Sequence, residues 1–530
     1  MRFAPILLCW SILLGAAEPV KKLKVFILAG QSNMEGQAVV DLTGKDYNGG
    51  KGTLVEVMAR PDNAARYAHL KDKDGKWVVR SDVWIRYQRE NRPLLKGGLG
   101  LGYAVYGDQH HFGPEYQFGH VVGEAYRDQV LIIKAAWGGK SLYQDFRPPS
   151  AGGETGKYYK LMVAQVREAL ANLKQDFPDY AGESVELAGF IWYQGWNDGV
   201  NPKTAVPEYG QNLVHLINDV RTEFGVPRLP MIIGELTGPW VDAPKEWTAL
   251  RKAQESVANR PEFKDNVVFV PTHDFVRKAE DSPNTGHGHH EFGNAETYFL
   301  VGDALGRAAV QMAGRDRQVR DVRGWTLRID QRLIDKNPAV VEKAVGLLDK
   351  HLEGVLKLIP AKAAAELKKT PLNFTLPYPG VRPTAEYHGG LDWVKKTGRE
   401  ISMAKSVEFT DVDKFEAETK RMPVFVLHEL AHAYHDKVVL GGYQNPEIKG
   451  AYDKAKASGT YDAVRRWTGT KFTDKPEKAY AMNNQMEYFA ESTEAYFARN
   501  DFEPFDRAEL QQKDPGMLLV VEKIWGITAK

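Results

Sequence analysis

Cysteine is nearly absent from this chain, and neither sign of charge is in excess. The single cysteine among 530 residues is Cys9, so the rest of the chain can form no disulfide and has no thiol chemistry. The 70 basic and 69 acidic side chains give a formal charge of +1, which leaves no global field to attract nucleic acid or an anionic membrane. Beyond the first residues, no apolar run is long enough to span a bilayer. These absences exclude a disulfide scaffold and a nucleic-acid-binding protein, and they favour neutral binding partners.

The N-terminal residues have the three-part layout of a secretory signal peptide. An apolar stretch at residues 6–14 follows a short start with Arg2, and the small residues Gly15, Ala16 and Ala17 come next. This order predicts a signal peptide over residues 1–17 and a secreted or periplasmic protein. The alternative, a membrane anchor, needs about twenty apolar residues and finds too few here.

The length and the pattern of short apolar runs predict two domains. A single hydrophobic core rarely serves a chain of 530 residues. The first half alternates short apolar runs with helix-like segments, which indicates an open, doubly wound α/β sheet with sites at the carboxyl ends of its strands. Residues 42–107 do not fit this rhythm and suggest a long insertion. The runs lie at residues 23–30, 129–136, 187–193, 230–234 and 267–271.

The second half has a different composition. Long, charged, helix-forming segments such as residues 338–367 replace the alternating strands, and one strand-like run at 406–410 precedes a further helix. We therefore predict a first domain over residues 18–315 and a mainly helical α+β domain over residues 316–530.

Four short motifs of the first half each supply one part of an acyl-transfer site. Gly-Gln-Ser-Asn-Met at 30–34 places Ser32 on the turn after the first strand, and Trp-Gly-Gly at 137–139 offers backbone N–H groups to an oxyanion. The segment 192–198 offers side-chain amides for the same purpose, and the histidines of 287–290 offer a general base. Each motif alone is weak, because serine in a glycine-rich turn is usually turn chemistry.

In this order, the motifs Gly-Gln-Ser-Asn-Met, Trp-Gly-Gly and Tyr-Gln-Gly resemble the SGNH hydrolases of the sialate O-acetylesterase and carbohydrate esterase family six branch. The resemblance covers about residues 23–313. It implies a flavodoxin-like three-layer α/β/α domain that removes acetyl groups from sugar hydroxyls without a metal or other cofactor. It also implies Ser32 as nucleophile, with Gly139 and Gln194 in the oxyanion hole and Asn197 as a second candidate there.

The general base is open among three histidines. The family places its histidine shortly before the last helix, which favours His290 over His287 and His289. The supporting aspartate that the family has two or three residues earlier is missing here, because those positions are Gly288 and His287. Asp281 or Glu280 can take its place, or Ser32 and His290 work as a dyad.

A second constellation lies in the second half. His-Glu-x-x-His at 428–432 stands in an apolar, helix-like segment, so His428 and His432 share one helix face and can bind one zinc ion while Glu429 polarises a water. A catalytic zinc takes a third protein ligand. Glu487, Glu491 and Glu494 lie at helical spacing and are the candidates, with one of them free to orient a ligand histidine.

The strings His-Glu-Leu-Ala-His and Glu-Tyr-Phe-Ala-Glu, with a tyrosine seven residues before the first Glu of the second string, resemble the lethal-factor-like zinc peptidases. This resemblance covers about residues 375–500 and implies a zincin-like fold. It makes Glu487 the third zinc ligand, Glu429 the general base and Tyr480 the donor to the oxyanion.

Together these motifs predict an exported hydrolase with two sites. The first would act on acetylated oligo- or polysaccharide, and the second, zinc-dependent site on a peptide or glycoprotein. The alternative is a carbohydrate-binding or adhesion protein with an inactive esterase-like domain and a structural zinc, which the missing aspartate favours.

Overall fold

The computed structural model describes residues 22–236, 244–378 and 385–527. The predicted signal peptide and Cys9 lie outside these residues, so export stays a prediction. The chain divides into two compact units, the first reaching Phe263 and including Val267–Gly306, the second holding Lys264–Asn266 and the chain from Arg307 onward. Among the described residues, no helix combines the length and apolarity that crossing a membrane requires.

A seven-stranded sheet in the order β4-β3-β6-β1-β7-β8-β9 is the centre of the first unit. Its strands pair in parallel apart from the edge strand β4, which is antiparallel to β3. The five strands expected from apolar runs are all present, so the predicted doubly wound α/β sheet is confirmed. The strands are β1 (Lys22–Gly30), β3 (Arg80–Gln88), β4 (Leu94–Leu99), β6 (Gln129–Ala136), β7 (Ser184–Tyr193), β8 (Met231–Gly234) and β9 (Val267–Val270).

Residues 42–107 were predicted as an insertion, and this is wrong for its second half, which supplies β3 and β4. The sequence did not predict β3, because Arg86 interrupts the apolar residues in the buried part of the strand. Arg86 is neutralised in the fold by Asp176 and Glu168, whose oxygens lie 2.8 and 2.7 Å from its Nε and Nη2.

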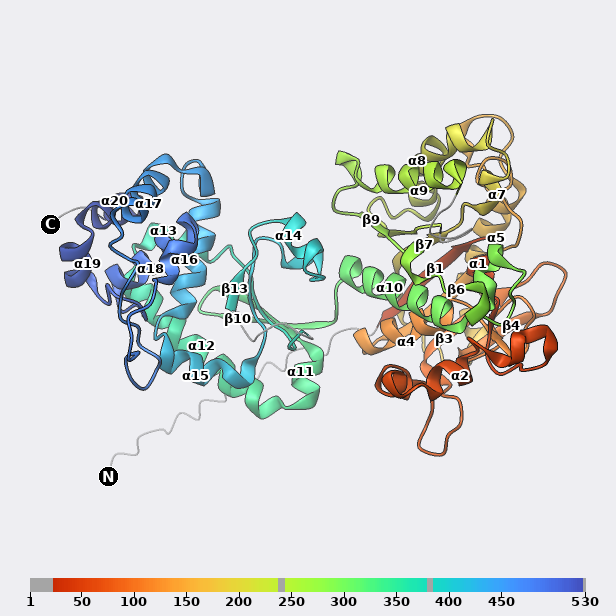
Figure 1. Cartoon of the computed structure of the whole chain (residues 1–530), viewed down its shortest axis with the longest axis horizontal. Coiled ribbons are helices and arrows are strands. Elements are labelled where there is room, and N and C mark those ends of the chain that lie inside the picture. Colours follow the sequence, from red (N-terminus) through yellow and green to blue (C-terminus); the bar gives the residue numbers. More distant parts are fainter. Residues whose placement is uncertain (1–21, 237–243, 379–384, 528–530) are drawn as a thin grey trace, which may run out of the picture. The chain divides into compact units, whose positions relative to one another are not determined.

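Helices cover both faces of this sheet. Alternate residues of β1 point to opposite faces: Val25 and Ile27 join a core with α5, α8 and α9, whereas Phe26 packs on Phe118 of α4. Figure 1 shows α8 and α9 on one side of the strands and α4 with α10 on the other. The helices are α1 (Ser32–Glu35), α2 (Leu54–Ala59), α3 (Ala64–Tyr67), α4 (Glu115–Ala125), α5 (Lys157–Ala171), α6 (Leu173–Asp176), α7 (Trp196–Gly199), α8 (Ala205–Phe224), α9 (Lys245–Ala258) and α10 (Ala295–Ala313); a small sheet pairs β2 (Ala38–Val39) with β5 (His111–Phe112).

The second unit combines many helices with a five-stranded sheet in the order β10-β11-β12-β14-β13. β11, β12 and β14 are parallel, while β10 and the other edge strand, β13, are antiparallel to their neighbours. The strands are β10 (Arg317–Val322), β11 (Trp325–Asp330), β12 (Leu372–Phe374), β13 (Ala385–Tyr387) and β14 (Val407–Phe409).

The helices of the second unit form its own core with this sheet. The unit is α+β, and its likeness to the zincin-like fold stays a prediction. The helices are α11 (Gln331–Lys336), α12 (Pro338–Leu358), α13 (Ala361–Leu367), α14 (Leu391–Lys396), α15 (Phe415–Arg421), α16 (Phe425–Lys437), α17 (Pro446–Ser458), α18 (Gln485–Phe497), α19 (Arg507–Lys513) and α20 (Pro515–Trp525).

Candidate functional sites

Ser32 stands at the carboxyl end of β1, around which the strand order changes direction. β1 ends at Gly30, where φ is +157° and an added Cβ would lie 2.1 Å from the Tyr193 carbonyl oxygen. Only glycine allows so close an approach. The chain turns there into α1, so Ser32 lies at the sheet edge where α/β proteins bind ligands. Ser32 is 5% exposed, and its hydroxyl makes no hydrogen bond within the residues that the structure describes.

The side chain of Gln31 joins the serine turn to the turn after β7. Its Oε1 accepts hydrogen bonds from the backbone N–H groups of Gly195 (3.1 Å) and Asn197 (3.3 Å) and from Nε2 of Gln194 (3.3 Å). Gln31 is buried, so these bonds are shielded from water. The sequence segments 30–34 and 192–198 are therefore held together by the glutamine that precedes the nucleophile candidate.

Gln194 was predicted as an oxyanion donor, but its amide is already used in the structure. Its Nε2 donates to Asp198 Oδ2 at 2.6 Å and to the Lys140 carbonyl oxygen at 3.0 Å. The other predicted amide, that of Asn197, is half-buried and makes no hydrogen bond with the described part of the chain. This arrangement favours Asn197 over Gln194 as the donor to a bound oxyanion.

Asp198 fixes the loop that follows β6. Its two carboxylate oxygens accept the backbone N–H groups of Leu142 and Tyr143, both at 2.9 Å. Burial raises the pKa of Asp198 to about 6, against the lowering effect of these hydrogen bonds and of Gln194. The sequence did not single out Asp198, although it lies within one of the predicted motifs.

The backbone at Gly138 and Gly139 lies directly beside Ser32. A Cβ added at Gly138 would be 3.6 Å from Ser32 Cβ and 3.0 Å from Glu35 Oε2. The carboxylate of Glu35 accepts the Gly138 N–H and, at Oε1, the Tyr87 hydroxyl at 3.0 Å. Gly139 follows with a φ of +67° and has no atom within 4 Å of an added Cβ, so open space lies on the Cβ side of its backbone.

The histidine segment is tied to α1 through Asn33, the residue after Ser32. Asn33 Nδ2 donates to Glu291 Oε1 at 2.9 Å and to the His289 carbonyl oxygen at 3.3 Å, while its Oδ1 accepts the Tyr298 hydroxyl at 2.8 Å. All of these bonds are buried or partly buried. They hold η8 (Gly288–Gly293), a kinked 3-10 turn, next to the serine turn.

The three histidines occupy different environments. His290 Nε2 lies 3.3 Å from Gln37 Nε2, while the half-buried His289 ring lies 5.9 Å from the Trp196 ring and His287 is exposed. Burial, aided by the charges of the other two histidines, lowers the pKa of His290 to about 4. His290 is therefore neutral above that pH, as a general base must be.

Neither predicted substitute for the family's aspartate reaches these histidines. Asp281 and Glu280 are exposed, and within the described ranges neither forms a hydrogen bond or ion pair with a histidine. This arrangement favours the alternative in which Ser32 and His290 work as a dyad, because no carboxylate contacts His290 within residues 22–236, 244–378 and 385–527.

The first unit matches a known protein family. A family model for the carbohydrate esterase, sialic acid-specific acetylesterase family matches residues 22–299, more than half of the chain. The chain belongs to this esterase family. The predicted relationship of the N-terminal part is confirmed, and the unit is a carbohydrate esterase domain.

Individual relatives of this esterase are distant. A probable carbohydrate esterase of Arabidopsis thaliana is 23% identical over 217 residues, 40% of this chain and 69% of that protein. Among solved structures, a protein from Arabidopsis thaliana covers 56% of this chain and 100% of its own, with 17% identity and a TM-score of 0.35. A carbohydrate acetylesterase from Xanthomonas citri covers 56% of this chain and 60% of its own, with 16% identity and a TM-score of 0.34.

The esterase family match ends at residue 299, so the predicted zinc site depends on the geometry of the second unit alone. His428 and His432 lie on α16, and Glu487 lies in the first turn of α18, where Asn484 caps the helix by accepting the N–H groups of Met486 and Glu487. Glu487 Oε2 is 3.2 Å from Nε2 of both histidines. Two imidazole nitrogens and one carboxylate oxygen within 4.8 Å of one another form a donor set that suits zinc.

The remaining predicted residues surround these three donors. Glu494 Oε2 lies 2.8 Å from Nδ1 of His428, which leaves Nε2 as the atom that faces Glu487. Glu429 Oε2 accepts the Tyr387 backbone N–H at 2.8 Å, so the general-base candidate is fixed against the edge strand β13. Tyr480 is 48% exposed, and burial together with the nearby Glu487 raises the pKa of its hydroxyl.

Glu491 was a further candidate ligand, and one of its carboxylate oxygens lies within 4.8 Å of donor atoms of His428 and Glu494, in a group that does not include His432. Glu491 Oε2 accepts a hydrogen bond from Asn500 at 3.1 Å, and the side chain is buried. Burial and the neighbouring Asp501 and Glu494 raise the pKa of Glu491 well above its usual value. Glu487 is therefore the carboxylate that meets both imidazoles.

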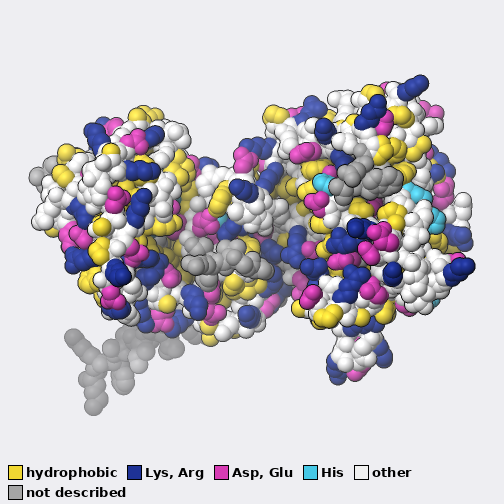
Figure 2. Space-filling view, viewed as in Figure 1, with side chains coloured by type: hydrophobic (Ala, Val, Ile, Leu, Met, Phe, Trp, Pro, Cys, Tyr) yellow, Lys and Arg dark blue, Asp and Glu magenta, His cyan; other side chains and the backbone are white. Residues whose placement is uncertain are grey.

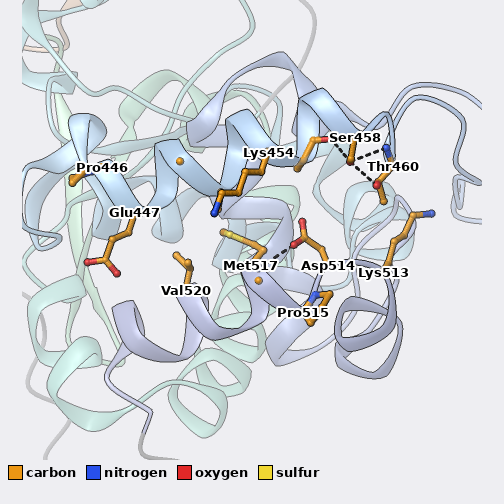
Figure 3. Close-up of a pocket in the computed structure, with 14 residues that line it drawn as sticks. Pro446, Glu447, Lys454, Ser458, Thr460, Lys513, Asp514, Pro515, Met517 and Val520 are labelled. Atoms are coloured by element: carbon orange, nitrogen blue, oxygen red, sulfur yellow. Dashed lines mark hydrogen bonds between the residues drawn. The ribbon is translucent and has the colours of Figure 1, made fainter.

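A cavity of about 540 Å³ lies elsewhere in the second unit, between α17 and the start of α20. Figure 3 shows Lys454 of α17 and Met517 of α20 on its walls, with Asp514 at the N-terminus of α20. None of the predicted catalytic or metal-binding residues lines it, so it is not part of either candidate site.

Proposed function

We propose that the first unit is a serine O-acetylesterase that removes acetyl groups from carbohydrate, with Ser32 as the nucleophile. The observation that carries the proposal is the convergence of three separate motifs on Ser32: Gln31 and Glu35 bind the two backbone turns, and Asn33 binds the histidine segment. Membership of the esterase family supports the substrate class.

The arrangement is suited to acyl transfer in two steps. Ser32 Oγ would attack the acetyl carbonyl carbon while its proton passes to His290, and the backbone N–H groups of Ser32 and Gly139 with the Asn197 amide would bind the oxyanion. The sugar oxygen then leaves with the proton from His290. Water, deprotonated by the same histidine, would attack the acyl-enzyme and release acetate, which restores Ser32.

A fluorophosphonate probe tests this proposal, because it reacts with activated serines. The wild-type protein and the Ser184→Ala control, whose serine is exposed at the start of β7, are expected to be labelled at Ser32, and Ser32→Ala is expected to stay unlabelled. Equal labelling of Ser32→Ala would contradict the assignment. A wild-type protein that binds acetylated sugar but takes up no label would support the alternative of a carbohydrate-binding domain.

For the second unit, we propose a zinc site held by His428, His432 and Glu487 with peptidase-like chemistry. It is supported by the meeting of their three donor atoms beside the edge strand β13. When bound, zinc supplies a Lewis acid for a water and a peptide carbonyl. Glu429 would take a proton from the attacking water, and Tyr480 would donate to the carbonyl oxygen.

Metal analysis tests the zinc proposal without relying on turnover. The purified protein is expected to hold close to one zinc per chain, and the paired substitution His428→Ala with His432→Ala is expected to abolish it. A wild-type chain that holds no zinc after gentle purification, and takes none up on dialysis against the metal, would overturn the proposal.

A further inference from the structure

Tyr106 is a largely open aromatic side chain beside the proposed esterase site. It lies between β4 and β5, and 56% of it is exposed. One side of its ring packs on the buried His111, with ring centroids 4.4 Å apart, while the rest is free to contact a ligand.

Hydrogen bonds connect Tyr106 to the catalytic histidine candidate. Its hydroxyl donates to Gln37 Oε1 at 3.5 Å, and Gln37 Nε2 in turn lies 3.3 Å from His290 Nε2. Gln37 follows α1 closely in the sequence, so Tyr106, Gln37 and His290 all lie around the serine turn.

The segment directly before Tyr106 is fixed by hydrogen bonds to its backbone. The Val105 N–H donates to the Gly36 carbonyl oxygen at 3.3 Å, and the Val105 carbonyl oxygen accepts Arg89 Nη1 at 3.2 Å. The buried ammonium of Lys134 donates to the Tyr103 carbonyl oxygen at 2.7 Å. The ring is therefore presented on an ordered backbone, which reduces the entropy that ligand binding would cost.

Further aromatic side chains lie next to His290. The His289 ring is 4.0 Å from the His290 ring and 5.9 Å from the Trp196 ring, which is half-buried and lies 5.3 Å from Trp247. We call the series Tyr106, Gln37, His290, His289 and Trp196 the aromatic row. Two imidazole rings and one glutamine side chain separate its two ends.

From this geometry we infer that the aromatic row is a platform for an oligosaccharide chain, with Tyr106 stacking on a sugar residue next to the acetylated one. The faces of a pyranose ring carry C–H groups that pack well on an aromatic face, while its hydroxyls stay in water. The acetylated residue must place its ester carbonyl at Ser32, near His290. Because Tyr106 and Trp196 are each linked to His290 through another side chain, neighbouring sugar residues would contact them.

The inference rests on the proposed esterase function, and it predicts a preference for longer substrates. The wild-type protein should hydrolyse an acetylated oligosaccharide with a higher kcat/KM than it does the acetylated monosaccharide.

Tyr106→Ala should lower kcat/KM for the oligosaccharide by about tenfold more than for a small aryl acetate, and Tyr106→Phe should retain most of the preference. Trp393→Ala is the matched control, since Trp393 is 47% exposed and belongs to the second unit.

Equal losses of Tyr106→Ala on both substrates, or a ratio within twofold of the wild type, would overturn the inference. A binding measurement separates this failure from failure of the proposed function. Calorimetry with the same oligosaccharide should show about tenfold weaker binding to Ser32→Ala/Tyr106→Ala than to Ser32→Ala alone. If the wild type hydrolyses no ester, the proposed function fails, and unchanged affinity in this pair would still reject the platform.

Discussion

Glu35 is placed to position neighbouring residues of the proposed esterase site. It contacts no substrate-binding atom directly, but it accepts the Gly138 N–H and the Tyr87 hydroxyl. It therefore fixes the backbone of the proposed oxyanion donor, Gly139, relative to Ser32. Burial raises its pKa, and the two donors that point at it favour the charged form, since a carboxylate accepts both.

We predict that Glu35→Gln lowers kcat for aryl acetate by about tenfold to a hundredfold, with less effect on KM. The amide has the same size, but its NH₂ group must face one of two donors, so the Gly138 turn shifts. Steady-state kinetics measures this split, with the exposed Glu154→Gln as control. A kcat that stays within twofold of the wild type in correctly folded Glu35→Gln would show that Glu35 does not position the turn.

Sequence motifs predict the residues that act within the motif itself. They do not reveal residues whose role depends on contacts with distant segments of the chain. Ser32 and Gly139 follow from short motifs at strand ends. The roles of Gln31, Asn33 and Asp198 depend on partners in other segments, which no local pattern reveals. Gln194 illustrates the same limit, because its amide is engaged by Asp198 and Lys140 in the folded chain.

At the scale of elements, two helices form the proposed zinc site. α16 carries both histidines one turn apart, and α18 carries Glu487 near its N-terminus and Glu494 two turns later. Because Glu494 binds Nδ1 of His428, the second helix would supply both a metal ligand and the partner that orients another ligand. Such a carboxylate stabilises the tautomer that binds metal.

We predict that Glu494→Gln weakens zinc binding by about 10- to 100-fold while the fold is kept. The substitution preserves the size of a buried side chain but removes the charge that supports His428. Competition with a chromophoric chelator measures the affinity, and Glu447→Gln on the exposed side of α17 is the control. An affinity equal to that of the wild type would mean that Glu494 is not part of the site.

Apolar strands and the helix of the proposed zinc site could be predicted, whereas strands without a clear apolar run could not. The β1 and β6 runs are buried on both faces, and each contains at least four consecutive apolar residues, at 25–29 and 130–133. β3 was not predicted, because Arg86 interrupts its apolar residues. The strand-like run at 406–410 predicts β14, whereas β12 and β13 have three residues each and show no period, so the edge strand next to Glu429 was missed.

For the whole molecule, the two proposed sites belong to units with separate hydrophobic cores. On the face seen in Figure 2, basic and acidic side chains are interspersed, in keeping with the nearly balanced charge of the chain. Neither site needs a residue from the other unit in the chemistry proposed. Removal of zinc should therefore leave ester hydrolysis intact.

Acetate release measures the proposed esterase activity of Ser32. The wild-type protein and Ser32→Ala would be compared on an acetylated polysaccharide and an aryl acetate, each with and without a zinc chelator. We expect acetate release to fall more than about a thousandfold in Ser32→Ala and to be unchanged by the chelator. Release that persists in Ser32→Ala, or that the chelator abolishes, would contradict it.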